Sequence, residues 1–272
     1  MIQTLSLDEI KTKQQITWAT GNYSIVGATL QIVGENLCEA MDLISGSTVL
    51  DVCAGNGNAT LAAARRYCKV TSIDYVQSLL EAGSQRAKAE GFDSFINFQV
   101  ADVENLPFDK HSFDYVLSTF GVMFSPNQEL SASELLRVVK PEGKIGLANW
   151  TPNGFIGQMF KLISSYVPPF PGLKSPALWG TSVHLEKLFG DKVSVLKNTK
   201  KDFHFRYRSP QHFVEVFKKY YGPTNKAFSS LNESTQRILD KEISNLIKIF
   251  NISKNESMNV PSEYLEVVLE LK

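Results

Sequence analysis

The residues with the clearest chemical potential lie between Asp51 and Thr60, where an acid is followed by a glycine-spaced turn and the start of a helix. The apolar residues 49–52 predict a buried parallel strand, and Gly55 and Gly57 allow the chain to turn tightly after it. A helix is expected to begin near Asn58. Free backbone N–H groups and the partial positive charge of a helix N-terminus suit a carboxylate or a phosphate. The stretch therefore predicts a loop that binds a nucleotide-type cofactor.

Two further acids stand at the ends of the next two predicted strands. Asp74 closes the second strand, where its carboxylate can accept hydrogen bonds from both hydroxyls of a ribose that lies across the glycine loop. Asp102 closes the third strand and is followed by Val103, which places an acid and an apolar residue beside the expected position of an adenine. Three consecutive strand ends together predict a site for an adenosyl group.

The elements that position these residues alternate between strand and helix patterns. Strands are expected at 48–53, 69–74, 96–101, 113–119 and 142–150, with helices near 58–67, 77–90 and 128–140. The apolar spacing of residues 25–44 predicts an amphipathic helix before the first strand. This alternation predicts an α/β protein with a parallel sheet and helices on both faces, whose ligands bind at the carboxyl ends of the strands.

The pattern changes after Trp150. Helices are expected near 154–166 and 181–189, a strand over 192–208, two further helices on the apolar stripes of 213–221 and 239–250, and a final strand at 264–269. The predicted organisation is a helical N-terminal lid or segment, a cofactor-binding core, a helical cap inserted before the last strand, and that last strand of the core sheet. Their ranges are 1–45, 46–209, 210–260 and 261–272.

Composition narrows the classes of partner. Lys and Arg together number 28, and so do Asp and Glu, so no overall basic field favours nucleic acid. The three cysteines form no C-x-x-C pair and no His/Cys cluster, which predicts no metal site and fits a reducing cytoplasm. The N-terminus shows no secretory signal pattern, and the uncharged residues 14–34 are too polar to predict an integral membrane segment.

The sequence contains four segments and a helix end that resemble the motifs of class I S-adenosylmethionine-dependent methyltransferases and occur in the same order. These are residues 49–57, 72–75, 101–108 and 113–118, followed by 141–144 (Pro-Glu-Gly-Lys). The sequence is most similar to the small-molecule branch that includes quinone C-methyltransferase-like enzymes (type 11). The resemblance implies a three-layer, Rossmann-like, seven-stranded sheet. It also implies transfer of a methyl group to a small, partly apolar acceptor (EC 2.1.1.-).

The resemblance further implies that S-adenosylmethionine lies on the glycine loop, that S-adenosylhomocysteine is the product, and that no metal takes part. Gly55 and Gly57 would pack against the methionine part of the cofactor, and Asp51 would support the loop or bind the ammonium group. The expected cofactor residues in this loop are Asp51, Cys53, Ala54, Gly55, Asn56 and Gly57. Cys53 departs from the family pattern because it stands where the first glycine of the usual triplet would be. Its side chain is expected either to point into the core or to narrow the loop.

At the other strand ends, the resemblance assigns the ribose to Asp74 and one flank of the adenine to Tyr75. Asp102 would accept a hydrogen bond from the exocyclic amine, and Val103 would offer its backbone N–H to the ring. The residues that would border the amino-acid moiety and the transferable methyl group are Ser118, Thr119 and Phe120.

Large apolar side chains outside these motifs predict where the acceptor lies. Aromatic residues gather in the segments outside the sheet, and an apolar wall follows the fourth strand, so both are candidates for a lid or a substrate wall. The candidates are Trp18, Tyr23, Met123, Trp150, Trp179 and Tyr221. No histidine has a sequence partner that marks it as a general base.

Two other classes of function stay open at this point. An NAD(P)-dependent oxidoreductase has the same strand, loop and acid, but its fingerprint wants Gly or Ala where this chain has the bulkier Thr60. A cofactor-binding module without catalysis is the second alternative, with Cys53 as its only support in the sequence. The sequence leaves open the acceptor, the choice among O-, N- and C-methylation, and the oligomeric state.

Overall fold

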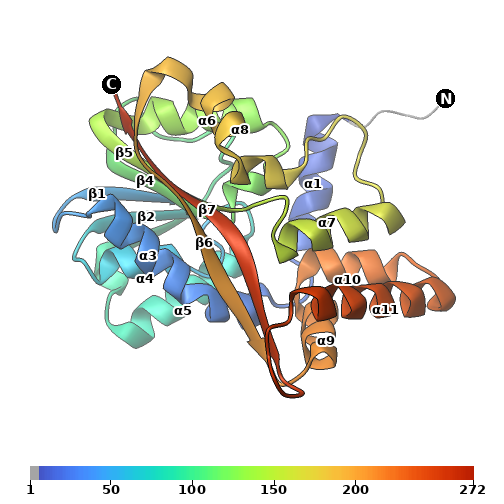
Figure 1. The fold of residues 1–272 in the computed structure, drawn as a ribbon. Helices are drawn as coiled ribbons and strands as arrows, with labels where there is room; N and C mark the ends of the chain where they lie inside the picture. The colour runs from blue at the N-terminus through green and yellow to red at the C-terminus, as the bar shows by residue number, and fades with distance from the viewer. Residues whose placement is uncertain (1–5) are drawn as a thin grey trace.

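A seven-stranded mixed sheet forms the centre of the protein in the computed structural model, which describes residues 6–272 (Figure 1). Residues 1–5, where the predicted N-terminal segment begins, lie outside the described residues. The strand order is β3-β2-β1-β4-β5-β7-β6. The strands are β1 (Thr48–Val52), β2 (Lys69–Asp74), β3 (Ile96–Val100), β4 (Phe113–Thr119), β5 (Val139–Trp150), β6 (Val193–Tyr207) and β7 (Met258–Leu271). This arrangement confirms the predicted α/β, Rossmann-like methyltransferase fold.

Strand direction brings the predicted site residues to one edge. Strands β1 to β5 pair in parallel, whereas β7 runs antiparallel to both of its neighbours, β5 and β6. Within the parallel part, Val52 is in register with Ile73, and Asp74 with Val100. The carboxyl ends of β1, β2 and β3 therefore lie side by side, and the loops that follow them share one rim of the sheet.

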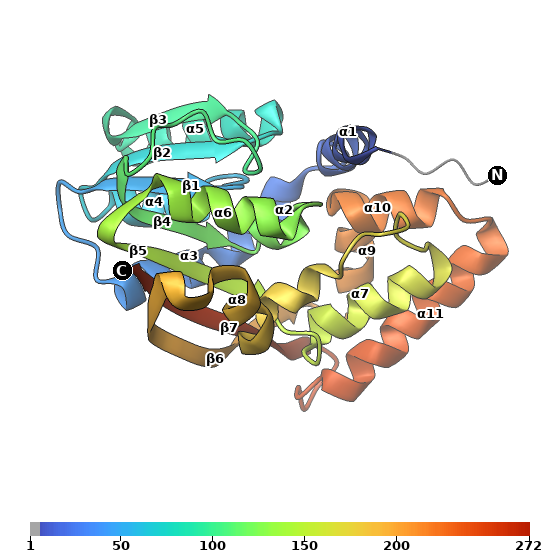
Figure 2. The same cartoon turned by 90° about the horizontal axis from the view of Figure 1, so that it is seen from above.

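Helices cover both faces of the sheet, as the alternating pattern predicts. Figure 1 shows α3, α4 and α5 on one face and α6 and α8 on the other. Figure 2 shows α1, α7, α9, α10 and α11 gathered beyond the ends toward which β2 and β3 point. The helices are α1 (Leu7–Trp18), α2 (Tyr23–Gly27), α3 (Gln31–Met41), α4 (Asn58–Ala64), α5 (Gln77–Glu90), α6 (Gln128–Val138), α7 (Phe155–Tyr166), α8 (Ser182–Phe189), α9 (Pro210–Tyr220), α10 (Gly222–Ser229) and α11 (Glu233–Phe250). Short 3₁₀ turns are η1 (Ala28–Leu30), η2 (Asp93–Phe95), η3 (Val122–Phe124), η4 (Pro176–Gly180) and η5 (Gly190–Lys192).

The N-terminal helix is interrupted where the sequence predicts a continuous one over 25–44. The chain instead forms α2, the 3₁₀ turn η1 and then α3. The carbonyl oxygen of Gly27 accepts a hydrogen bond from the side-chain amide of Asn58 at 2.6 Å. A β-carbon on Gly27 would also lie 2.5 Å from the side-chain oxygen of Asn56. The glycine loop therefore packs against Gly27, while the backbone departs from helical angles at Leu30, just before α3.

The helices between β6 and β7 begin at side-chain caps. Ser209 accepts a hydrogen bond from the N–H of His212 at the start of α9, and Asn232 accepts one from the N–H of Thr235 at the start of α11. Helix α7 packs against α11, so residues before 210 also join this helical layer. The predicted boundary between core and cap at 209/210 stays a prediction.

Candidate active site

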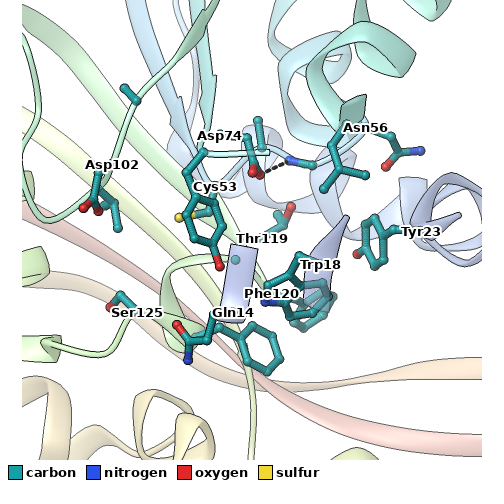
Figure 3. Close-up of a pocket in the computed structure, with 18 of the residues that line it drawn as sticks. Gln14, Trp18, Tyr23, Cys53, Asn56, Asp74, Asp102, Thr119, Phe120 and Ser125 are labelled. Carbon is teal, nitrogen blue, oxygen red and sulfur yellow. Dashed lines mark hydrogen bonds between the residues drawn. The ribbon is translucent and has the colours of Figure 1, made fainter. Parts of the chain in front are cut away.

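A cleft at the carboxyl edge of the sheet encloses about 800 Å³, part of it open to solvent (Figure 3). Its walls come from the loops after β1 to β4 and from the N-terminal helices. Most of the residues predicted for the cofactor lie on it, together with two of the lid candidates. They are Trp18, Tyr23, Cys53, Ala54, Gly55, Asn56, Asp74, Tyr75, Asp102, Val103, Thr119 and Phe120. Segments that are far apart in the sequence thus meet in one place.

Asp74 joins the second strand to the glycine loop. One of its carboxylate oxygens accepts a hydrogen bond from the N–H of Gly55, and the other accepts one from the N–H of Val76, each at 2.9 Å. Burial raises the pKa of Asp74 to about 6, and these backbone hydrogen bonds oppose the rise. A carboxylate offers about four acceptor positions, so two stay free for donors of a ligand in the cleft.

Asp51 lies beneath the loop rather than on the wall of the cleft. Its Oδ2 accepts a hydrogen bond from the Thr60 hydroxyl at 2.6 Å, and that hydroxyl lies 2.8 Å from the hydroxyl of Ser72. Its Oδ1 is buried and has no hydrogen-bond partner within the described part of the chain. Burial raises the pKa of Asp51 to about 7, with hydrogen bonds from Thr60 opposing the rise. Thr60 therefore has a structural role at this position, because its hydroxyl donates a hydrogen bond to Asp51 that Gly or Ala could not make.

Cys53 has a backbone conformation that favours glycine, which explains why the family pattern has glycine at this position. Its φ is +52°, in the left-handed region that glycine adopts most readily. Cys53 lines the cleft and also packs against the hydrophobic core, so both expected alternatives describe it in part. Burial raises the pKa of the Cys53 thiol well above its ordinary value, which keeps the thiol uncharged. The side chain is thus a small apolar part of the wall.

Asp102 forms an ion pair with Lys11, a residue of α1 that the sequence did not single out. Nζ of Lys11, on α1, lies 2.7 Å from Oδ2 of Asp102 and 2.8 Å from Oε2 of Glu104. The Glu104 carboxylate is almost fully buried and also accepts a hydrogen bond from the N–H of Asn127. Through Lys11, α1 therefore contacts the end of the cleft where the adenine is predicted.

Further residues line the cleft that the sequence did not single out. Three polar side-chain atoms at the cleft are buried and have no hydrogen-bond partner among residues 6–272, namely Oε1 of Gln14, Nδ2 of Asn56 and Oγ of Ser125. The additional lining residues are Lys11, Gln14, Asn58, Leu79, Ala101, Gly121, Phe124, Ser125 and Pro126. Helix α1 has a single buried residue, Ile10, so no apolar stripe marks its contact with the sheet. Ser125 and Pro126, in contrast, directly follow the predicted wall.

A second, smaller cavity of about 350 Å³ adjoins the cleft. Both are lined by Trp18, Tyr23, Phe120 and Phe124, so these four side chains stand between them. The ring centroids of Trp18 and Tyr221 are 5.5 Å apart and nearly perpendicular. The remaining lining residues are Val26, Leu30, Trp150, Ile156, Phe205, Phe217 and Tyr221. Within the described chain, no charged side chain lines this cavity.

Five predicted residues line neither cavity, and Asp51, described above, is one of them. Gly57 precedes α4 in a left-handed conformation, and the Ser118 hydroxyl donates to the carbonyl of Val52 at 2.9 Å and accepts from the N–H of Val122 at 3.0 Å. Met123 and Trp179 are fully buried in the core, where Trp179 packs edge-on against Phe189. This corrects the expectation that Met123 and Trp179 contact the substrate or form a lid, because packing beneath the surface occupies both side chains.

Comparisons with known proteins show which family and fold the chain resembles. Residues 50–147 match the family model described as a methyltransferase domain. Protein Rv1403c of Mycobacterium tuberculosis is 36% identical over 242 residues, which cover 87% of this chain and 88% of that protein. The demethylmenaquinone methyltransferase of Bacillus cytotoxicus is 33% identical over 137 residues, or 48% of this chain and 57% of that protein. Among solved structures, YcgJ of Bacillus subtilis has the same fold, with a TM-score of 0.62 at 17% identity over 88% of this chain and 98% of that one.

The chain belongs to the class I S-adenosylmethionine-dependent methyltransferases, in the type 11 branch. The fold and the order of the strand-end motifs are those of this class. Among residues 6–272, no group of three or more His, Cys, Asp or Glu is arranged to hold a metal ion. No helix in the described part of the chain is long and apolar enough to cross a membrane.

Proposed function

We propose that the cleft binds S-adenosylmethionine and that the adjoining aromatic cavity binds a small, partly apolar methyl acceptor. The observation that carries this proposal is the shared wall. Because Trp18, Tyr23, Phe120 and Phe124 line both spaces, a ligand in one would meet a ligand in the other at these side chains. A direct transfer between two bound molecules requires this kind of adjacency.

The polar groups of the cleft fit the cofactor's functional groups. Asp74 has free acceptor positions for the ribose hydroxyls, and Nδ2 of Asn56 is a buried donor without a partner near the glycine loop. The start of α4 after Gly57 adds partial positive charge beside the loop. A carboxylate of the methionine part would satisfy such donors. These features support binding of the methionine end at residues 53–57.

The adenine end of the proposed site lies at Asp102 and Val103. The Asp102 carboxylate would accept a hydrogen bond from the exocyclic amine, and Leu79 and Tyr75 supply apolar surface for the ring. Lys11 already contacts one oxygen of Asp102. Helix α1 would therefore have to move to admit the cofactor and would close over it afterwards.

When bound, S-adenosylmethionine supplies a methyl group on a sulfonium centre, which is activated for in-line displacement. The protein's task is then to align the acceptor and exclude water. Phe120 stacks on Trp150 with ring centroids 3.8 Å apart, which gives the acceptor cavity a rigid floor. Trp18 and Phe124 close the space from the side of α1 and η3. The name of the Bacillus cytotoxicus relative, a demethylmenaquinone methyltransferase, supports a small-molecule acceptor here as well.

Ligand-dependent stabilisation tests the cofactor assignment. Each of S-adenosylmethionine, S-adenosylhomocysteine and NADH is added to the protein, and thermal unfolding is recorded. A ligand at a hundredfold of its Kd adds about 2.7 kcal/mol, which raises the Tm of a chain of this size by several degrees. We expect a shift with the first two compounds. Substitution of Asp74→Asn should weaken the shift, whereas Asp93→Asn, an exposed change outside the cleft, should preserve it.

The outcomes separate the three classes of function. A shift with NADH alone would favour an oxidoreductase. A shift with S-adenosylmethionine but no methyl transfer to any member of a panel of phenols, enols, thiols and amines would favour a binding module. Transfer to an apolar member of the panel supports the proposal.

A further inference from the structure

The smaller cavity, called the aromatic cavity here, has polar groups of one kind only. Its polar side-chain groups are the hydroxyls of Tyr23 and Tyr221 and the indole N–H groups of Trp18 and Trp150. Each of these is a hydrogen-bond donor. Among the described residues that line the cavity, no carboxylate, imidazole, amide or ammonium group occurs. The cavity therefore offers donors to a ligand but no base that could take a proton from it.

The two tyrosines stand close together in this space, with Tyr23 on the wall that the cavity shares with the cleft. Their ring centroids are 6.3 Å apart, and Trp18 packs edge-on against both rings. Tyr221 is only 7% exposed, but neither its hydroxyl nor that of Tyr23 is among the fully buried polar atoms that lack a partner within residues 6–272. Both residues line the cavity, and a phenol hydroxyl on a cavity wall can donate a hydrogen bond to an acceptor atom of a bound ligand.

Burial also fixes the protonation of these groups. It raises the pKa of Tyr23 to about 12, with a further contribution from the negative charge of Asp74. It raises the pKa of Tyr221 well above the ordinary value, with Tyr23 as the nearby titratable group. Both phenols thus keep their protons at neutral pH. They can donate hydrogen bonds, but they are poor bases.

On the basis of the proposed function, we infer that the acceptor enters the aromatic cavity already ionised, as a phenolate or enolate whose oxyanion is held by the hydroxyls of Tyr23 and Tyr221. The substrate class is then an apolar molecule with an acidic phenol or enol, which loses its proton to solvent before it is buried. Methylation follows at the oxygen or at the conjugated carbon.

The electron balance of the transfer suits such a cavity. The electron pair of the acceptor forms a bond to the methyl carbon, while the carbon–sulfur bond breaks and its pair stays on sulfur. The negative charge of the acceptor and the positive charge of the sulfonium disappear together, and no proton has to move. Low polarity favours a step in which opposite charges cancel. A neutral amine would instead retain a positive charge and need a proton acceptor, which the described lining does not provide.

A coloured phenol tests the inference without turnover. We propose titrating 4-nitrophenol, whose anion absorbs at longer wavelength than the neutral form, with the protein saturated by S-adenosylhomocysteine. The bound probe is expected to ionise at least one pH unit below the free probe, which corresponds to a tenfold preference for the anion. The neutral analogue 4-nitroanisole should bind at least tenfold more weakly than the anion.

Matched variants assign the effect to the hydroxyls. Tyr221→Phe and the double substitution with Tyr23→Phe should reduce the anion preference stepwise, whereas Tyr67→Phe, an exposed position outside both cavities, should leave it unchanged. Tyr221 lines the aromatic cavity and not the cleft, so Tyr221→Phe should retain the affinity for S-adenosylhomocysteine, which also reports that the variant is folded.

Three results would overturn the inference: tighter binding of the neutral phenol, an unchanged anion preference in the folded double variant, or no saturable binding of the probe. A wild-type protein that does not bind S-adenosylhomocysteine would instead overturn the proposed function. The two failures are therefore distinguishable.

Discussion

Cys53 and Phe120 adopt left-handed backbone conformations at the ends of the neighbouring strands β1 and β4, with φ angles of +52° and +56°. Both side chains line the cleft. The next residue, Gly121, lies so close to Cys53 that a β-carbon on it would stand 2.4 Å from the Cys53 carbonyl oxygen. Two turns with strained backbone are thus in contact at the place where the proposed methyl transfer occurs. Strained backbone conformations are frequent at active sites.

Substitution of Cys53→Gly should release part of this strain. A non-glycine residue in the left-handed region costs about 1 kcal/mol, so the free energy of unfolding should rise by about that amount. Urea denaturation measures the change. Glu142→Gly is the matched control, since Glu142 has a φ of +61° and is exposed, and it should show a similar rise. A loss of stability in Cys53→Gly beside a gain in Glu142→Gly would contradict the prediction, because packing of the thiol would then outweigh strain.

A substitution of Gly121→Ala should do the opposite. The φ of Gly121 is −99°, so alanine meets no backbone strain there, but its β-carbon would collide with Cys53. Overpacking of this kind lowers the free energy of unfolding by roughly 1–3 kcal/mol. Displacement of the loop should also weaken binding of S-adenosylhomocysteine, measured by calorimetry.

Gly91→Ala is the control for Gly121→Ala. Gly91 has a φ of +75° and no atom near its missing β-carbon, so strain alone should act there. We expect a loss of about 1 kcal/mol and an unchanged ligand affinity. An unchanged affinity in a folded Gly121→Ala variant would show that the contact with Cys53 does not position the loop.

The stability of the ligand-free protein should fall as pH rises from about 4 to about 7. Burial raises the pKa of Asp51 to about 7 and that of Asp74 to about 6, above their values of about 3.9 in an unfolded chain. Between these values the folded state binds more protons than the unfolded state. The stabilisation is therefore complete below pH about 4 and is lost as pH rises through the folded pKa, by at most about 1.4 kcal/mol per pH unit for each group.

Urea denaturation between pH 4.5 and 7.5 checks this slope. Asp51→Asn should flatten it, and Asp93→Asn, an exposed substitution, should leave it as in the wild type. If the free energy of unfolding still falls steeply with pH in a protein that carries both Asp51→Asn and Asp74→Asn, other groups cause the pH dependence.

Loss of the Lys11 ammonium should accelerate ligand release. Lys11 holds α1 to Asp102 and to the buried Glu104, so Lys11→Met removes the ion pairs that keep this helix over the cleft. We expect the dissociation rate of S-adenosylhomocysteine to rise five- to tenfold, measured by stopped-flow displacement. Lys13→Met is the control, since Lys13 lies on the same helix and its nearest aromatic contact is the ring of Phe170. Equal rates in the two variants would argue against a role of α1 as a closing element.

The sheet and the cofactor side of the cleft could be predicted because their signals are local. Asp74 and Asp102 each follow an apolar strand directly, and the glycine loop carries its own turn chemistry. Parallel pairing then brings these strand ends together without any further information. The departure of Cys53 from the family pattern could be read from the sequence, whereas its left-handed backbone conformation is a finding of the structure.

Long-range contacts account for what the sequence did not predict. Lys11 meets Asp102 across 91 positions, from a helix with little apolar surface. Gly27 meets Asn58, on a different element, across 31 positions. In the sequence, Trp179 does not differ from the other aromatic residues that follow the core motifs. Its burial against Phe189 depends on how η4 and α8 pack against each other. Neither periodicity nor residue type carries this information.

The position of β7 between β5 and β6 affects how the protein can be made. Strand β7 is among the last elements of the described chain, yet it fills an interior place of the sheet. During synthesis, β5 and β6 must wait with open edges until residues 258–271 have left the ribosome. Such edges invite wrong pairing. Nascent chains stalled before this point should be the species that chaperones bind most strongly.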